Sequence, residues 1–430
     1  MNTAFTLENT VWSNSKKIGF RFFFSYFILF IFFNNNGAYP FFSYIEGLYN
    51  NVLYEFIPWV GKVVFGITET IRVGPNGSGD TTYDYLLMFT IAIVSVMAAI
   101  VWSLFDRNSK HYIKMYYWLT LSLRLYVGLM LISYGMVKVI QLQFSSPSMY
   151  RLTQAYGESS PMGLAWTFLG FSKGYNLFMG IAEVAAVLLL FRRTLTFGLI
   201  ITLMTTANVM AVNYFYDVPV RILSTHLVIM SAFLLARDFN KLCQFFFLKK
   251  AIILTSLQKP KFKKGFTTFL AVSKIVLLSY SLGYGAYSTL QSKEMYRGEG
   301  SKSILAGFYE IKELTVNNEK IEQTLKSDIS GWKHLMIDGK RYAQIQLSNH
   351  KSSWYKIEVD SIAEKLKLTR DTLRVYDLKY RIGEGTDFYL DGTAGRDTIS
   401  IKLKRTKDYN EKFLLTNRGF HWINEVPYNR

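Results

Sequence analysis

Residues 85–105 read YLLMFTIAIVSVMAAIVWSLF, a run of 21 residues that contains no charged side chain. A helix rises about 1.5 Å per residue, so about 20 apolar residues cross the hydrocarbon core of a bilayer. Comparable runs lie on both sides of this one. They occupy residues 18–33, 118–140, 175–191, 195–215, 218–235 and 266–287. The sequence therefore predicts an all-α polytopic membrane bundle of about seven transmembrane helices.

The composition agrees with this prediction. Of the 430 residues, 50% are hydrophobic and 19% are charged, whereas about 25% are charged in soluble domains. A net charge of +18 is also common in nucleic-acid-binding proteins. Here, however, the basic residues lie mainly in short loops, and no zinc spacing or RNP-type motif accompanies them. We therefore expect the lipid bilayer as a partner, no nucleic acid and, with Cys243 as the single cysteine, no metal site.

The loop charges predict the orientation of the bundle. Loops on one side carry most of the lysine and arginine, including the basic segment at 249–264. The alternate loops hold only Lys62, Arg72, Arg151, Lys173 and Arg221. Basic loops face the cytoplasm. We therefore expect a bacterial inner membrane protein with a cytoplasmic N-terminus and a periplasmic C-terminal domain.

Composition changes along the chain suggest four regions. Residues 1–116 form an N-terminal membrane region with two spans and an outer loop, in which 51–70 is an interfacial or re-entrant helix. A four-helix membrane bundle follows at 117–250. A basic cytoplasmic loop and the last span occupy 251–290, and a β-rich domain occupies 291–430.

The β-rich domain shows short segments of alternating polar and apolar residues. Candidate strands are 304–314, 332–337, 341–347, 354–359, 372–380, 388–391, 398–403 and 412–416. Asp338-Gly339 and Asp391-Gly392 are typical of hairpin turns, and 361–368 is interpreted as a short helix. About eight strands in this length predict an antiparallel barrel or sandwich. The aromatic end at 420–422 is expected to pack onto it.

Four residues of the run at 118–140 share one helix face, namely Arg124, Gly128, Gly135 and Lys138. Glycines let a neighbouring helix approach closely. Ionisable groups at membrane depth are costly and are functional candidates by default. This face is therefore expected to point into the bundle.

Helix rise places four polar side chains at one depth. Tyr134, Glu183, Asn208 and His226 lie six to eight residues inside the outer ends of their runs, which is about 9–12 Å below the surface. Lys138 lies just above them. A phenol, a carboxylate, an amide and an imidazole at one level predict a polar pocket.

Two interpretations of this layer remain open. In the first, Glu183 pairs with Lys138 or His226 and only holds the bundle together, as buried ion pairs often do. In the second, Glu183 relays a proton. Asp217 and Arg221 are four residues apart and are expected to pair near the outer end of their helix.

Residues 117–247 resemble the DoxX-like membrane proteins. The matching stretches are Arg124-Leu-Tyr-Val-Gly128, Tyr134-Gly-Met-Val-Lys138, Tyr156-Gly157, Gly180…Glu183, Leu188-Leu-Leu-Phe-Arg192-Arg193-Thr194, Asn208-Val209 and Tyr216-Asp217-Val218-Pro219-Val220-Arg221. The resemblance implies a four-helix membrane core and a link to membrane quinones or redox stress. It leaves the activity open, because fold does not determine function.

Three functions compete. The first is a non-catalytic subunit or scaffold whose domain at 291–430 binds a periplasmic or membrane protein partner. The second is a quinone-linked oxidoreductase in which Glu183 relays a proton. Its ligand-binding candidates are Tyr134, Lys138, Glu183, Asn208 and His226. The third, transport of a small solute, ranks last because no inverted repeat or broken-helix pair is evident. A quinone is the candidate cofactor.

Overall fold

The computed structural model describes residues 11–254, 263–297, 302–321, 331–371, 374–419 and 421–426. The chain forms two compact units. The first combines Met1–Phe144 with Leu164–Thr289, and the second combines Ser145–Gly163 with Leu290–Arg430. The segment 145–163, which follows the third apolar run of the helical region, thus belongs to the second unit.

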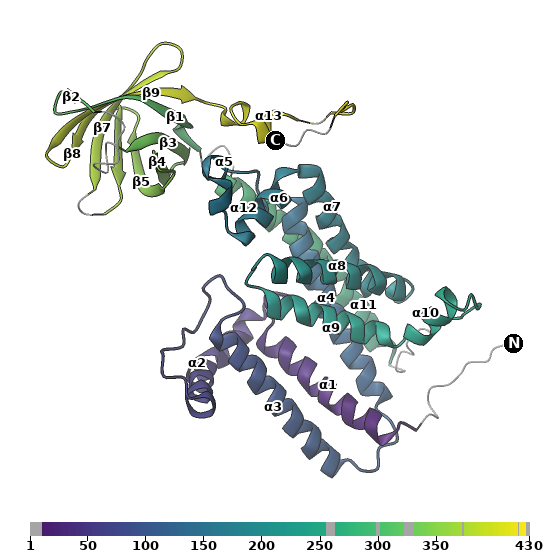
Figure 1. The fold of residues 1–430 in the computed structure, drawn as a ribbon. Coiled ribbons are helices and arrows are strands. Elements are labelled where there is room, and N and C mark those ends of the chain that lie inside the picture. The colour runs from purple at the N-terminus through teal and green to yellow at the C-terminus, as the bar shows by residue number, and fades with distance from the viewer. Residues whose placement is uncertain are drawn as a thin grey trace. The chain divides into compact units, whose positions relative to one another are not determined.

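The first unit is helical (Figure 1). The helices in and next to it are α1 (Asn14–Phe33), α2 (Ser43–Phe65), α3 (Thr82–Phe105), α4 (Ile113–Val139), α6 (Pro161–Phe171), α7 (Lys173–Val184), the 3₁₀ segment η3 (Ala185–Leu190), α8 (Leu195–Phe215), α9 (Arg221–Ala236), α10 (Phe239–Phe246), α11 (Lys264–Ser279), the π-helical turn η4 (Tyr280–Tyr284) and α12 (Gly285–Arg297).

Within the described residues, five helical segments are long and apolar enough to cross a membrane. They are Thr82–Phe105, Ile113–Val139, Lys173–Leu190, Leu195–Phe215 and Lys264–Met295. The pair α9–α10, bent by 73°, makes a sixth if it counts as one span. The predicted membrane bundle is confirmed with five or six spans. The remaining predicted span, at 18–33, lies in α1, which carries Lys16, Lys17 and Arg21. That α1 crosses the membrane stays a prediction.

Local sequence explains where these helices begin and end. Thr81 and Asp84 form a capping box at the start of α3, which satisfies backbone donors that the first turn leaves free. α2 ends at Gly66, whose φ of 66° suits a residue without a Cβ. α2 lies where the sequence predicts an interfacial or re-entrant helix at 51–70, although it begins eight residues earlier, and its position relative to the membrane stays a prediction. Leu48, Val52 and Trp59 are exposed along it.

The second unit contains a β-barrel (Figure 1). Its strands are β1 (Lys302–Val316), β2 (Glu319–Lys320), β3 (Trp332–Gly339), β4 (Tyr342–Leu347), β5 (Ser352–Asp360), β6 (Lys365–Thr369), β7 (Val375–Ile382), β8 (Asp387–Ala394) and β9 (Asp397–Thr406). All neighbouring strands are antiparallel, and β1 pairs with β9 to close the sheet. The predicted barrel or sandwich is therefore a barrel of eight long strands, with β2 added at one edge.

Side chains fill the barrel interior. Alternate residues point inward, and Tyr309, Trp332, Phe388 and Leu403 are each fully buried in one cluster. An eight-stranded barrel is just wide enough for side chains to fill. The barrel interior is thus packed as a hydrophobic core of aromatic and aliphatic side chains.

Three expectations for this domain are wrong. Residues 361–368 were predicted as a short helix, but 365–368 belong to β6, because Leu366 and Leu368 alternate into the barrel while Lys365 and Lys367 point out. Residues 412–416 are not a strand and include the short helix α13 (Leu414–Asn417). Asp391-Gly392 is not a turn but lies inside β8, where Gly392 pairs with Leu378 and Ile399. The end at 420–422 lies partly outside the described residues.

Gly392 is required by a close contact between two strands and not by a turn. A Cβ at this position would lie 2.1 Å from the carbonyl oxygen of Asp377 on the neighbouring strand. The two backbones therefore approach more closely than any side chain permits.

A short helix and the C-terminal segment cover part of the barrel exterior. α5 (Met149–Thr153) places Met149 against Phe308 and Met336, and Tyr409 and Phe413 pack on the same cluster. Gln346 Nε2 also donates to the carbonyl of Thr153 at 3.0 Å. The segment 145–163 is therefore integrated into the barrel unit.

Candidate functional site

The crossing of α4 and α7 brings the predicted charged residues together. Gly135 and Gly180 face each other at this crossing. A Cβ on Gly135 would lie 2.7 Å from the carbonyl oxygen of Gly180, and a Cβ on Gly180 would lie 2.8 Å from that of Gly135. The absence of side chains at both positions lets the two backbones touch, as small residues do in membrane helix packing.

Lys138 and Glu183 lie one turn from these glycines and form an ion pair. Lys138 Nζ donates to both Glu183 carboxylate oxygens, each at 2.7 Å. The side chains are only 8% and 3% exposed. The spacing is the same on both helices, because Gly135 precedes Lys138 by three residues and Gly180 precedes Glu183 by three. Close backbone contact thus sets the distance at which the two charges meet.

Other polar and aromatic groups surround the Lys138 ammonium. It lies 5.7 Å from the ring centroids of Tyr134 and Phe144, within the range of a cation–π contact. Asn176 lies on the same face of α7 as Gly180 and Glu183 and is 1% exposed. Its Nδ2 donates to the Phe144 carbonyl at 2.8 Å, while its Oδ1 has no hydrogen-bond partner among the residues that the structure describes. Sequence reasoning missed Asn176, although its i, i+4, i+7 spacing with Gly180 and Glu183 was available.

Arg124 and Gly128 also meet the α7–η3 segment. Arg124 is 6% exposed, and its Nε donates to the Leu189 carbonyl at 2.7 Å. A Cβ on Gly128 would lie 3.5 Å from the Ala186 carbonyl oxygen. In the 3₁₀ segment η3 the backbone hydrogen bonds join residues three apart instead of four. Arg124, from α4, donates to one of the carbonyls of this segment, that of Leu189.

The other two members of the predicted layer lie elsewhere. His226 Nε2 is 2.8 Å from the Tyr26 hydroxyl, its Nδ1 is 2.7 Å from the Ile222 carbonyl, and its ring stacks on Phe30. His226 therefore faces α1. Asn208 is exposed on α8. The equal depth of the four side chains stays a prediction, and depth by itself does not specify the direction in which each side chain points.

Arg221 has a closer partner than the predicted one. Its Nη1 lies 3.6 Å from Asp217, which is 75% exposed, and its Nε lies 3.1 Å from Asp80, which is 1% exposed. Asp80 also accepts the backbone N–H groups of Arg221 and Ile222 at 2.7 and 2.9 Å. A carboxylate from the loop before α3 thus caps the N-terminus of α9, where negative charge is favourable.

A further polar cluster, on α1 and the end of α3, was not predicted. Arg21 is 4% exposed and donates to the Tyr112 hydroxyl at 2.9 Å and to Ser103 at 2.7 Å. Tyr112 in turn donates to Asp106 at 2.9 Å. Hydrogen bonds from Ser109 and Tyr112 hold the pKa of Asp106 below its usual range. An arginine inside an apolar run was the only sequence signal for this cluster.

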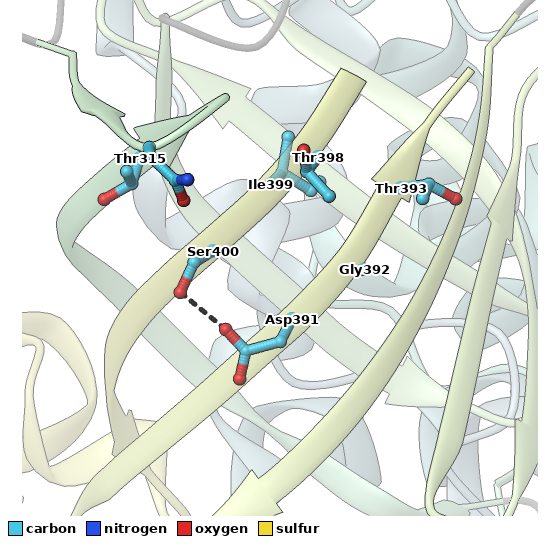
Figure 2. A pocket seen from close by; sticks show the side chains of 8 residues that line it. Thr315, Asp391, Gly392, Thr393, Thr398, Ile399 and Ser400 are labelled. Carbon is cyan, nitrogen blue, oxygen red and sulfur yellow. Dashed lines mark hydrogen bonds between the residues drawn. The ribbon is translucent and has the colours of Figure 1, made fainter. Parts of the chain in front are cut away.

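The barrel exterior has a shallow pocket of about 390 Å³. Figure 2 shows its polar lining, in which Thr315, Asp391, Thr393 and Ser400 come from β1, β8 and β9. Ser400 donates a hydrogen bond to Asp391 across the two neighbouring strands. The pocket offers hydroxyls and one carboxylate to a polar ligand or to a partner chain.

In the part of the chain that the structure describes, no three His, Cys, Asp or Glu side chains gather closely enough to hold a metal ion. The geometry instead gives one closed ion pair at a tight helix crossing and one polar pocket on the barrel.

Comparison with known proteins identifies one informative relative. Over 121 residues the chain is 37% identical to the uncharacterized protein YwoB of Bacillus subtilis (strain 168). The match covers 77% of YwoB and 28% of this chain. The chain belongs to the same family as YwoB. No family model and no solved structure matches the chain. Since YwoB is uncharacterized, it transfers no activity, and most of this chain lies outside the match.

Proposed function

We propose that this member of the YwoB family is a non-catalytic membrane subunit or scaffold, of the DoxX-like type and linked to quinone or redox processes, whose barrel binds a protein partner. The chain is a polytopic membrane protein with an attached β-barrel. The observation that carries the proposal is the closed Lys138–Glu183 pair. Each charge satisfies the other, and the Gly135–Gly180 contact holds them at that distance. This arrangement supports a structural role.

The barrel supports the partner-binding half of the proposal. Its interior is filled by residues such as Trp332 and Phe388, so its exterior is the surface available for binding. The pocket around Thr393 and Ser400 is a hollow on that exterior with a largely polar lining (Figure 2). Basic residues concentrated in alternate loops support a periplasmic location for the barrel and a cytoplasmic N-terminus.

Photo-crosslinking in intact cells tests this proposal. A photoreactive amino acid would replace Thr393 in the pocket and, as a control, Ser361, which is exposed in the turn between β5 and β6. We expect a discrete protein adduct from position 393 and none from position 361. Adducts of equal yield from both positions, or from neither, would contradict a specific partner at this surface.

Topology requires a separate measurement. A reporter that is active only outside the cytoplasm, fused after Ser292, should be active, and the same reporter fused after Arg193 should be inactive. The reverse pattern would refute the periplasmic assignment of the barrel.

A quinone-linked oxidoreductase is the alternative. Tyr134 and the unpartnered Oδ1 of Asn176 favour it, because both accompany the Glu183 carboxylate on the crossing helices. In this case Glu183→Gln should abolish quinone-dependent turnover while the protein still folds. Purified protein that contains no quinone, together with unchanged turnover in Glu183→Gln, would eliminate the alternative.

A further inference from the structure

A second pocket in the helical unit lies away from the Lys138–Glu183 crossing. It has a volume of about 290 Å³ and is formed by the loop before α2, the first turn of α2, α4, and the turn η4 with the start of α12. Its lining includes Tyr39, Phe41, Glu46, Ser133, Tyr280 and Tyr284. Neither the predicted polar layer nor the barrel pocket uses these residues.

Two unusual backbone segments meet at this pocket. Phe41 has a φ of 61°, which is a genuine outlier for a bulky residue. Tyr280–Tyr284 forms a π-helical turn, and such turns are frequent at functional sites. The two segments contact each other, because the rings of Phe41 and Tyr280 have centroids 5.4 Å apart. Strained residues of this kind cluster at ligand clamps, where the surrounding structure holds them.

The loop that carries Phe41 is held firmly on its inner side. The Asn35 side chain accepts the Tyr39 backbone N–H at 2.9 Å, and the Tyr39 hydroxyl donates to the Ser122 carbonyl at 3.0 Å. Tyr126 donates to the Asn34 carbonyl. Phe41 itself is 68% exposed. The loop is therefore anchored to α4, while an aromatic ring is presented beside the pocket.

The charge and the aromatic rings of the lining define the ligand chemistry. Glu46 is its one acidic side chain, and lysine and arginine are absent from it. No ion pair joins Glu46 to any residue that the structure describes. Tyr280 and Tyr284 stack with centroids 5.0 Å apart, and both line the same pocket as this carboxylate. Aromatic faces attract cations, and a nearby carboxylate supplies the counter-charge.

We propose that this pocket binds an organic ammonium group, with Glu46 as its counter-ion and the rings of Phe41, Tyr280 and Tyr284 packed around it. Hydroxyls of the lining, such as that of Ser133, can donate to an adjacent phosphate or ester oxygen. The ligand class therefore includes ethanolamine and choline headgroups of lipids as well as free ethanolamine and choline. An anionic headgroup without an ammonium does not belong to it.

Native mass spectrometry of the purified full-length chain tests the proposal. The probes are phosphatidylethanolamine, phosphatidylglycerol with the same acyl chains, and free ethanolamine. We expect phosphatidylethanolamine to bind about tenfold more tightly than phosphatidylglycerol. If free ethanolamine competes with phosphatidylethanolamine, the headgroup alone provides the affinity, and if it does not compete, the acyl chains contribute to it. Equal binding of the two lipids overturns the proposal.

Matched variants locate the binding. Glu46→Gln and Tyr284→Leu should each weaken phosphatidylethanolamine binding by about tenfold. Glu55→Gln changes an exposed acid on the same helix and should leave binding unchanged. Thermal unfolding of each variant checks that it is folded. Preferential phosphatidylethanolamine binding that survives both Glu46→Gln and Tyr284→Leu refutes the site. None of these readouts depends on the barrel partner or on Glu183.

Discussion

Removing one charge of the Lys138–Glu183 pair should cost far more stability than removing both. The ammonium nitrogen lies 2.7 Å from each carboxylate oxygen, and the side chains are 8% and 3% exposed. At that distance and an effective dielectric constant of about 20, the Coulomb attraction is about 6 kcal/mol. Withdrawing each ion from water costs several kcal/mol, so the intact pair adds little net stability. A single unpaired charge, in contrast, has no compensation.

The variants Lys138→Met and Glu183→Leu should therefore each lower the free energy of unfolding by about 3–5 kcal/mol. The double variant places two apolar side chains of similar volume in the same space. It should lose no more than about 1–2 kcal/mol and should be more stable than either single variant. Lys173→Met, at an exposed position on α7, serves as the control for removal of a cation.

Unfolding of the full-length protein in mixed micelles, followed by tryptophan fluorescence as the fraction of denaturing detergent rises, measures these differences. The prediction concerns non-additivity. A loss in free energy of unfolding in the double variant that equals the sum of the losses in the two single variants would show that Lys138 and Glu183 have other essential partners. That result would refute the structural interpretation of the pair.

The remaining predictions concern packing, helix capping and pH. Gly180→Ala should destabilise the protein by about 1–3 kcal/mol through overpacking, whereas Gly174→Ala on the same helix has only an ordinary contact at 3.9 Å and should be neutral or stabilising in the same unfolding assay. Asp80→Ala removes the cap of α9 and should cost about 2 kcal/mol, against less than about 0.5 kcal/mol for Asp217→Ala, and similar losses would contradict the capping role. Burial lowers the pKa of His334, so the unfolded chain binds its proton more readily, and the barrel should lose stability as the pH falls through the ordinary histidine range. Hydrogen exchange of β3 and β4 at pH 7 and pH 5 measures this loss, and His334→Gln should reduce it.

Much of the fold follows from local patterns. Apolar runs of sufficient length predicted α3, α4 and α8 close to their observed bounds, since periodicity and length are properties of contiguous residues. Alternation predicted most barrel strands for the same reason. It failed at Gly392, where a glycine typical of turns serves a close strand contact that depends on Asp377, a residue on another strand.

In the candidate site, too, some features follow from local sequence patterns and others depend on contacts between distant residues. Helical spacing placed Arg124, Gly128, Gly135 and Lys138 on one face, and each of them meets the α7–η3 segment. The contact between His226 and Tyr26 could not be predicted, because the two residues are 200 positions apart.

The sequence by itself determined that this chain has membrane-length helices followed by a β domain, and that costly charges lie within the apolar runs. Hydrophobicity and its period are local, and the bilayer imposes a fixed length on them. Only the tertiary structure decided that Lys138 meets Glu183, that Asp80 caps α9 and that β1 closes on β9. Each of these depends on the rotation and crossing of elements distant in the chain, which the packing of all of them determines together.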